Sequence, residues 1–350
     1  MRKHIPLRIG RSQWKLDMRA MAVTGALCLA VLIAIMLSAG IGETWINPMR
    51  VLRTLIGNGG EMDTLIVHSL RLPRVLLALA VGIGLATAGA ILQGIVRNPL
   101  AAPDIIGVTS GASVAVVLFL YLFSNTNNAL TVSIRWMPVA AVCGAVTAGL
   151  LVYALAWKKE GASTFRLVLI GIGLAMCAQS LTTLLMIKSS IYQAAQANVW
   201  ITGSVSKATW EQVRIIAPVT IVLLALCLFS IRSLNVQRLD DSTAVGVGSR
   251  VQRDRFLLLL LSTALAGGAV AFGGNIGFVG LMAPHIARRM VGSSFGALLP
   301  ATALIGGLLV MLADLLGRTL FSPYEIPAGV FTAAIGAPYF VFLLYKTRKS

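Results

Sequence analysis

The sequence contains few charged residues, and acidic residues are the scarcest of them. Asp, Glu, Lys and Arg make up 12% of its 350 residues, and 12 acidic residues stand against 29 basic ones. So little charge does not cover the surface of a globule of this length, which excludes a soluble protein. Apolar residues make up 57% of the chain, and the mean hydropathy is +0.86. The sequence therefore predicts a membrane protein whose remaining surface is covered by lipid.

Motifs for metal, disulfide and nucleotide chemistry are also missing. The cysteines Cys28, Cys143, Cys177 and Cys227 lie in separate apolar runs without C-x-x-C spacing, which excludes a disulfide framework and a thiolate metal site. The three histidines are equally dispersed. No G-x-x-x-x-G-K-[ST] segment is present to hold nucleotide phosphates. We therefore expect no catalytic residue, no metal site and no cofactor bound by this chain, with any ATP hydrolysed by a partner subunit.

Long apolar runs dominate what the sequence does contain. A helix needs about 20 residues to cross the hydrocarbon core of a bilayer. One run, residues 276–288, is short and interrupted by glycines and Pro284, so we expect a broken or tilted helix surrounded by protein. The predicted fold class is all-α, a polytopic membrane protein with about ten transmembrane helices. The ten runs are residues 20–40, 75–96, 105–123, 136–157, 165–187, 213–231, 256–272, 276–288, 297–316 and 327–345.

The basic N-terminal arm, residues 1–19, sets the expected orientation. A cleaved signal peptide is the alternative, but the first run is longer than the core of such a peptide and no small-residue cleavage box is clear. With the arm in the cytoplasm, most Lys and Arg residues fall on the cytoplasmic side, in line with the positive-inside tendency. The arm is then followed by a single transmembrane domain over residues 20–345 and a cytoplasmic tail over residues 346–350. Anionic lipid headgroups account for the net charge of +17 without nucleic acid.

The motif RLPR at residues 71–74 departs from this charge pattern. The topology places Arg71 and Arg74 on the outer side, at the N-terminus of the second span, where the helix dipole is already positive. Pro73 suits the first turn of that helix. Something anionic should therefore compensate the pair. Lipid phosphates reached by snorkelling are one candidate. Carboxylates of a docking protein, whose geometry matches the guanidinium fork, are the other.

Small residues recur at helical spacing along the second span. Such a stripe usually allows close packing between helices, and the alternative is the wall of a translocation pathway. A wall of small and weakly polar groups offers no strong ligand to a bulky complex, which suits passage. The stripe consists of Gly82, Ala86, Gly89, Ala90, Gln93 and Gly94.

Five blocks of the sequence resemble the FecCD/BtuC-type permeases of bacterial ABC importers, which take up iron-siderophore complexes, haem and cobalamin. The resemblance covers nearly the whole chain after the N-terminal arm, and the blocks occur in the order typical of that family. They are RLPRVLLALAVGIGLATAGAILQGIVRNPLAAPDIIGVTSGA at 71–112, LIGIGLA at 169–175, VWITGSVS at 199–206, GFVGLMAPHIARR at 277–289 and EIPAGVFTAAIGAPYFVFLL at 325–344.

The resemblance implies a BtuC-like permease, a translocation subunit and no enzyme, in the bacterial cytoplasmic membrane with both termini in the cytoplasm. Its implied partners are cytoplasmic ABC ATPase subunits, an extracytoplasmic substrate-binding lipoprotein and a second permease subunit, identical or related. Ferric siderophore is the expected cargo, and haem or cobalamin are alternatives. An ion-gradient-driven secondary transporter is the rival class, together with a channel or receptor. Coupling to an ion gradient usually needs ionisable groups within the membrane, and only Asp314 lies well inside a span, where pairing with Arg318 explains it equally well.

The resemblance also assigns site residues. In the family, the two arginines of RLPR and an arginine ahead of the last helix pair with acidic residues of the binding protein, which implies a docking role for Arg71, Arg74 and Arg318. The second helix approaches the central passage, so a pathway-lining role is implied for three members of the stripe. These are Ala86, Gly89 and Gln93.

The polar loop at residues 232–255 has two interpretations. A solvated connector is one, and the family's short helices that transmit movement of the ATPase are the other, over residues 239–249. In either case Asp241 or Ser242 is expected to cap the start of a short helix, and Gly246 and Gly248 are expected to end it. The expected coupling residues are Leu239, Asp240, Asp241, Ala244, Gly246 and Arg250.

Overall fold

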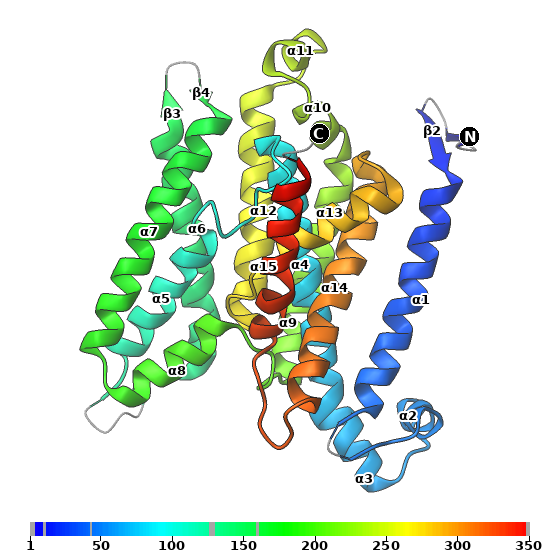
Figure 1. Ribbon diagram of the computed structural model, residues 1–350, viewed down its shortest axis with the longest axis vertical. Coiled ribbons are helices and arrows are strands. Elements are labelled where there is room, and N and C mark those ends of the chain that lie inside the picture. Colours follow the sequence, from blue (N-terminus) through cyan, green and yellow to red (C-terminus); the bar gives the residue numbers. More distant parts are fainter. Residues whose placement is uncertain (1–3, 10–11, 43, 126–129, 159–160, 348–350) are drawn as a thin grey trace.

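A computed structural model of the chain describes residues 4–9, 12–42, 44–125, 130–158 and 161–347. These are almost entirely helical, and the long helices run side by side along the long axis of the molecule (Figure 1). The helices are α1 (Met18–Gly40), α2 (Pro48–Leu55), α3 (Glu61–Thr64), the π-helical segment η1 (Leu65–Arg71), α4 (Leu72–Val96), α5 (Val108–Leu122), the 3₁₀ turn η2 (Ile134–Trp136), α6 (Met137–Ala156), α7 (Thr164–Lys188), α8 (Ile191–Thr202), α9 (Trp210–Phe229), α10 (Ile231–Gln237), α11 (Asp241–Gly246), α12 (Val251–Gly273), α13 (Val279–Val291), α14 (Phe295–Thr319) and α15 (Ala328–Thr347).

Two small antiparallel hairpins were not predicted from the sequence. Strand β1 (His4–Ile9) pairs with β2 (Ser12–Asp17) ahead of α1, and β3 (Trp157–Lys158) pairs with β4 (Gly161–Ala162) between α6 and α7. The all-α fold class is confirmed for the rest of the described chain. The division into an arm, one transmembrane domain and a tail stays a prediction.

Eight helical stretches of the described chain are long and apolar enough to cross a membrane. One of them is continuous from α3 through η1 to α4. The two other expected spans are shorter helices, α5 with 15 residues and α13 with 13. The run around Pro284 thus forms a short helix, but α13 is continuous through Pro284 where a broken or tilted helix was expected. Because α13 packs against α4 and α14, protein covers much of it, as a short helix at membrane depth requires.

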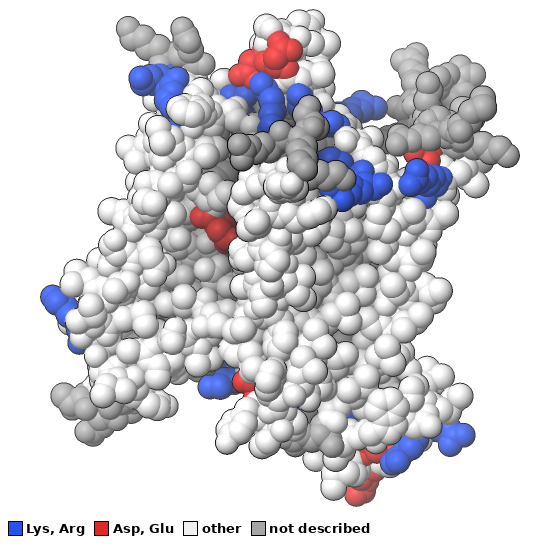
Figure 2. Space-filling view, in the orientation of Figure 1, with Lys and Arg blue, Asp and Glu red and all other residues white. Residues whose placement is uncertain are grey.

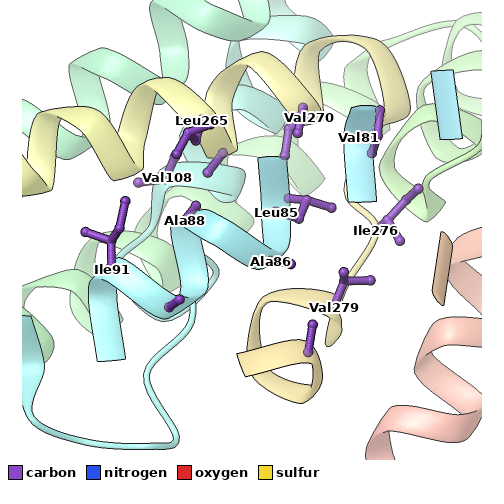
Figure 3. Close-up of a cluster of buried hydrophobic side chains, with 14 of the residues drawn as sticks. Val81, Leu85, Ala86, Ala88, Ile91, Val108, Leu265, Val270, Ile276 and Val279 are labelled. Carbon is purple, nitrogen blue, oxygen red and sulfur yellow. The ribbon is translucent and has the colours of Figure 1, made fainter. Parts of the chain in front are cut away.

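Helix α4 is the axis of the bundle. In the most apolar stretch of the span that contains it, 83% of the residues are buried, against 17% in α7. Figure 3 shows Leu85 and Ile91 of α4 in a buried cluster with Leu265 and Val270 of α12 and with Val279 of α13. Helices therefore surround α4 on several sides, whereas α7 turns most of its surface outward.

The small residues of α4 allow this packing. A Cβ atom at Gly82 would lie 2.2 Å from the carbonyl oxygen of Gly306 in α14. A Cβ atom at Gly89 would lie 1.8 Å from the carbonyl oxygen of Gly280 in α13. Real Cβ contacts are not that short, so both helix crossings require glycine at these positions. Close packing, the commoner reason for such a stripe, therefore accounts for both glycines.

The two ends of the bundle differ in what they carry (Figure 1). At one end, here called the α11 end, lie α10, α11, the β3–β4 hairpin and both chain termini. At the other, the α2 end, lie α2, α3 and the connection from α14 to α15. Figure 2 shows that charged side chains gather toward the two ends and that the band between them is mostly uncharged. This distribution suits a bundle whose middle lies in lipid.

Candidate functional site at the two ends of helix α4

Each end of α4 carries an arginine that shares an aspartate with a second arginine. At the α2 end, Arg74 and Arg318 share Asp314. At the α11 end, Arg97 and Arg255 share Asp241. We call the first group, with Arg71 and Glu325, the α2-end cluster. We call the second group, Arg97, Asp241 and Arg255, the α11-end cluster.

Arg74 is the centre of the α2-end cluster. Its Nε atom donates to both carboxylate oxygens of Asp314, at 3.0 and 2.9 Å. Its Nη1 atom donates to Oε1 of Glu325 at 2.7 Å. Asp314 is almost completely buried on α14, whereas the Glu325 side chain, between α14 and α15, is 49% exposed. Arg74 is thus bonded to the buried carboxylate of Asp314 and to the surface carboxylate of Glu325.

The other two arginines of this cluster cap the C-terminus of α1. Arg71 Nη1 donates to the carbonyl oxygens of Ala39 and Gly40, at 2.9 and 2.8 Å, and Nη2 donates to that of Thr44 at 2.6 Å. Arg318 Nη2 donates to the carbonyl oxygen and the hydroxyl of Ser38. The last carbonyls of a helix lack partners within it and carry the negative end of its dipole. The two guanidinium groups therefore satisfy atoms that are partly negative.

The compensation expected for RLPR is thus found inside the chain. It comes from Asp314 and Glu325 for Arg74, and from the end of α1 for Arg71. The structure brings the three predicted docking arginines together at one end of the bundle, each less than a tenth exposed. Their docking role stays a prediction. Arg318 lies 3.8 Å from Asp314, as the spacing on α14 indicated, but the closer partner of Asp314 is Arg74.

Sequence reasoning did not find Glu325 or the carbonyl groups of α1. Glu325 stands at the start of the block EIPAG, directly ahead of the last helix, and this position was the available signal. The carbonyl groups of α1 could not be predicted as partners, because every residue has a backbone carbonyl group.

Local sequence places Arg97 at the end of α4. Its backbone has a left-handed conformation, with φ of 55°, which ends the helix ahead of Pro99. Its Nε atom donates to the carbonyl oxygen of Gln237, the last residue of α10, at 2.8 Å. Its Nη2 atom is paired with Asp241. The side chain therefore runs from the end of α4 to the α10–α11 connection.

Arg255 approaches the same carboxylate from α12. Its Nη2 atom lies 2.8 and 3.1 Å from the two oxygens of Asp241. Its Nη1 atom donates to the carbonyl oxygen of Ala162 in β4 at 2.6 Å. The residue is fully buried. Asp241 therefore connects α11 to α4, to α12 and, through Arg255, to the β3–β4 hairpin.

The segment predicted to couple to an ATPase contains the expected short helix, with one correction. The N-cap is Asp240, whose carboxylate accepts the backbone N–H of Thr243 at 3.1 Å, instead of Asp241 or Ser242. The reason is that the Asp241 carboxylate is turned toward two arginines. Helix α11 ends at Gly246, and Gly248 follows with φ of +81°. Ala244 is buried beneath the helix.

Part of the outward surface of this segment is apolar. The side chains of Leu239, Val245 and Val247 are exposed, with Val245 and Val247 each 62% exposed, beside the exposed polar residues Asp240, Ser242 and Thr243. Arg250, the last of the predicted coupling residues, is exposed immediately before α12. Figure 1 shows α11 as the outermost helix at its end of the bundle. An apolar tip outside the lipid band is a feature of a protein-binding surface.

Asp241 of α11 and Asp240, its N-cap, are both ionised at neutral pH. Hydrogen bonds from the hydroxyl of Ser242 and from Thr243 lower the pKa of Asp240. Partial burial acts to raise the pKa of Asp241, but the hydrogen bonds and charges of Arg97 and Arg255 outweigh it, so that this pKa is lowered. A lowered pKa means that the ion pairs of Asp241 are lost only when the pH falls below the ordinary carboxylate range.

The three predicted pathway residues lie inside the subunit. Ala86 and Gly89 are buried where α4 meets α14 and α13. The Gln93 amide donates to the carbonyl oxygen of Leu281 at 3.4 Å, and its oxygen accepts from Arg288 Nη2 at 3.0 Å. Within one chain these contacts join α4 to α13. Their lining of a pathway stays a prediction. No group of three or more His, Cys, Asp or Glu residues suited to a metal ion occurs among the residues described.

Eight long apolar helical stretches in the described chain, with the two charged clusters at their ends, define a multi-pass membrane protein. Residues 29–346 match the FecCD transport family, and the chain belongs to that family. It is therefore a translocation component of an ABC transporter.

Individual proteins agree with this placement. The chain is 61% identical over 316 residues to the probable siderophore transport system permease protein YfhA of Bacillus subtilis (strain 168), covering 90% of this chain and 92% of that protein. It is 45% identical over 341 residues to the achromobactin transport system permease protein CbrC of Dickeya dadantii (strain 3937), covering 97% and 96%. A solved metal-chelate type ABC transporter in an inward-facing conformation superposes with a TM-score of 0.82 at 32% identity, covering 93% and 99%.

Proposed function

We propose that this chain is the permease subunit that carries a ferric siderophore into the bacterial cytoplasm, driven by ATP that separate ATPase chains hydrolyse. The observation that carries the proposal is the 61% identity, over nine-tenths of the chain, to a permease named for siderophore transport. A second relative is named for achromobactin, and the solved structure for a metal chelate. Haem and cobalamin remain the alternative cargoes.

Uptake by cells tests this cargo. The chain is expressed with its ATPase and binding protein in bacteria that lack siderophore import, and uptake of radiolabelled iron is measured with hydroxamate, catecholate and citrate-type chelators. Haem and cobalamin are offered in parallel. We expect uptake of at least one ferric chelate and of neither alternative cargo. Uptake of haem or cobalamin alone contradicts the proposal, and so does iron uptake that a protonophore stops while cellular ATP is maintained.

We infer that the α11 end faces the cytoplasm, with both chain termini. The excess of basic residues on that side of the predicted topology supports this orientation. Single cysteines are introduced at Val245, on α11, and at Tyr324, at the α2 end, in a variant without its four native cysteines. Both side chains are well exposed. A membrane-impermeant maleimide should label Y324C in intact cells and V245C only after permeabilisation, and the opposite result reverses the orientation.

We infer that the α2-end cluster receives carboxylates of a binding protein. Three arginines and two carboxylates leave one positive charge in excess, at the end of the bundle opposite α11. Arg74 is the member that is paired with a surface carboxylate, because its partner Glu325 is half exposed. A carboxylate from the binding protein can take the place of Glu325, whereas Arg71 and Arg318 hold α1 in place.

We infer that residues 239–249 bind the ATPase. The exposed apolar tip formed by Leu239, Val245 and Val247 supports this role. Replacing residues 239–249 with a Gly/Ser linker should abolish co-purification of the ATPase. Tyr324→Asp, a substitution of an exposed residue at the other end, serves as the control and should leave the yield unaltered. Unchanged ATPase yield with the linker contradicts the assignment.

We infer that a second permease subunit, identical or related, completes the passage. Helices α7 and α15 support this, since most of their residues are not buried within one chain. Native mass spectrometry of the purified transporter distinguishes two copies of this chain from one copy with a related chain. A complex that contains a single permease subunit and still transports contradicts the inference.

A further inference from the structure

Helix α11 is too short to hold its own position. It has six residues, and isolated helices shorter than about 12 residues are marginal in water. Its cap at Asp240 is local and fixes the backbone of the first turn only. The position of α11 relative to the bundle must therefore come from contacts with neighbouring elements.

Asp241 provides the charged contacts of α11 with the bundle. Its carboxylate is paired with Arg97, at the end of α4, and with Arg255, near the start of α12. Arg97 also donates to the carbonyl oxygen of Gln237, so the same arginine holds both ends of the α10–α11 connection. One carboxylate thus joins the short helix to two long ones.

Arg255 depends on this carboxylate. It is completely buried, its Nε atom lacks a partner, and its only ion pair among the described residues is with Asp241. A buried guanidinium without a counter-charge is costly, so Asp241 and Arg255 are expected to move together.

We propose that Asp241 is a positioning residue that fixes α11 to the ends of α4 and α12, so that movement of α11 is passed to these helices. The proposal rests on the proposed binding of residues 239–249 to the ATPase and assigns Asp241 a different task from the rest of that segment. The Asp241 carboxylate is paired with Arg97 and Arg255, whereas Val245 of α11 and the flanking Leu239 and Val247 are exposed. The contact with the ATPase and the transmission of its movement are then carried by different residues of one segment.

A matched pair of variants tests this assignment in the complete transporter, reconstituted in liposomes with its ATPase and binding protein. Asp241→Asn removes the charge that holds Arg97 and Arg255. Asp254→Asn removes the same charge from the neighbouring first turn of α12, and its amide oxygen still accepts the hydroxyl hydrogen bond from Ser249. The quantities measured are co-purified ATPase, ATP hydrolysed and cargo transported.

With Asp241→Asn, we expect the ATPase to co-purify and to hydrolyse ATP as before, and cargo carried per ATP to fall about tenfold. Asp254→Asn should leave all three quantities unchanged. Asp241→Glu, which restores the charge, should recover most of the transport. Arg97→Gln should lower transport less than Asp241→Asn, and the double variant should be no worse than Asp241→Asn, because both changes break one network.

Spin labels provide a readout that ATPase affinity does not influence. With labels at positions 245 and 253, both exposed in the wild type, the distance distribution between α11 and α12 should broaden in Asp241→Asn and stay narrow in Asp254→Asn. The permease is measured without its ATPase.

Two outcomes overturn the proposal. If Asp241→Asn loses the ATPase while the label distribution stays narrow, Asp241 contacts the ATPase directly. If the variant transports with unchanged cargo per ATP, the ion pairs do not transmit movement. Both results leave the proposed function intact as long as the wild-type complex transports, and a wild-type complex that fails to transport counts against the function instead.

Discussion

The two ends of α4 carry the same chemical group in different settings. Each has one aspartate between two arginines, but Asp314 is 3% exposed on the 25-residue helix α14, whereas the Asp241 side chain is 49% exposed on the six-residue helix α11. At the α2 end the ion pairs join long helices that are packed together along their lengths. At the α11 end they hold a helix that has little else to hold it.

The difference lies in what breaking each ion pair does. Removing one partner of a buried pair leaves an uncompensated charge and costs about 3–5 kcal/mol. A half-exposed pair contributes about 1 kcal/mol or less, because water and salt screen it. The α2-end cluster should therefore matter chiefly for stability, and the α11-end cluster chiefly for the position of a small element. The predictions below test this contrast, from the largest expected effect to the smallest.

Asp314→Ala should destabilise the protein most. It leaves Arg74 without its buried partner and removes the nearby charge from Arg318, so we expect a loss of about 3–5 kcal/mol in the free energy of unfolding. Thermal unfolding in detergent, followed by fluorescence, measures this loss. A loss below about 1 kcal/mol would show that the cluster is screened like a surface pair and would remove the contrast.

Arg74→Gln and Glu325→Gln should change the affinity for the binding protein in opposite directions. Arg74→Gln removes the guanidinium that pairs with the surface carboxylate of Glu325, and we expect about tenfold weaker binding, as for loss of a charged hydrogen-bonded pair. Glu325→Gln removes the internal competitor for Arg74, so binding should tighten a few-fold. Biolayer interferometry with the permease in nanodiscs measures both, and unfolding temperatures check that the variants fold. Weaker binding by Glu325→Gln would indicate that Glu325 itself contacts the partner.

Asp241→Asn should affect global stability less than Asp314→Ala. Asp241 is half exposed and its amide replacement can still accept a hydrogen bond from the buried Arg255, so we expect a loss of about 1–3 kcal/mol in the free energy of unfolding. The same thermal assay as for Asp314→Ala measures it. A loss as large as that of Asp314→Ala would mean that the buried Arg255 makes the ion pairs at the α11 end as important for stability as those at the α2 end.

Mild acidification should have the smallest effect. The pKa of Asp241 is lowered by its arginines, so its contribution is complete above the ordinary carboxylate pKa of about 4 and is lost only as the pH falls through the lower, folded-state value. Cargo transported per ATP should therefore be the same at about pH 8 and about pH 5.5. A loss of coupling within this range would mean that the carboxylate is already protonated there and is not held by two arginines.

Much of the architecture followed from local patterns. Apolar runs predicted the spans, the glycines of the second span predicted close packing, and the short run at residues 276–288 predicted a short helix, because each depends on residues that are near in sequence. The lengths of α5 and α13 were less accessible, since they depend on where neighbouring helices cover the chain. The β3–β4 hairpin was missed because its two strands, of two residues each, leave no periodic signal.

Only part of the candidate site could be predicted from the sequence. Residues 71–74 indicated that two outward arginines need negative partners, but not which ones. Arg74 finds Asp314 at a separation of 240 residues, and Arg71 finds the end of α1. The N-cap of α11 was predicted at Asp241 or Ser242 and is Asp240, for a similar reason. The Asp241 carboxylate binds arginines that are distant in sequence and does not cap the helix.

Composition and spacing by themselves determined that this chain is a bundle of membrane-spanning helices with arginines at the N-terminal end of the second span and a short polar-capped helix in the loop at residues 232–255. Only the tertiary structure decided how the charges are paired. Hydrophobic periodicity depends only on residues that are near in sequence, whereas these ion pairs form only once two distant segments are packed together. The two shared aspartates, one at each end of α4, are products of that packing.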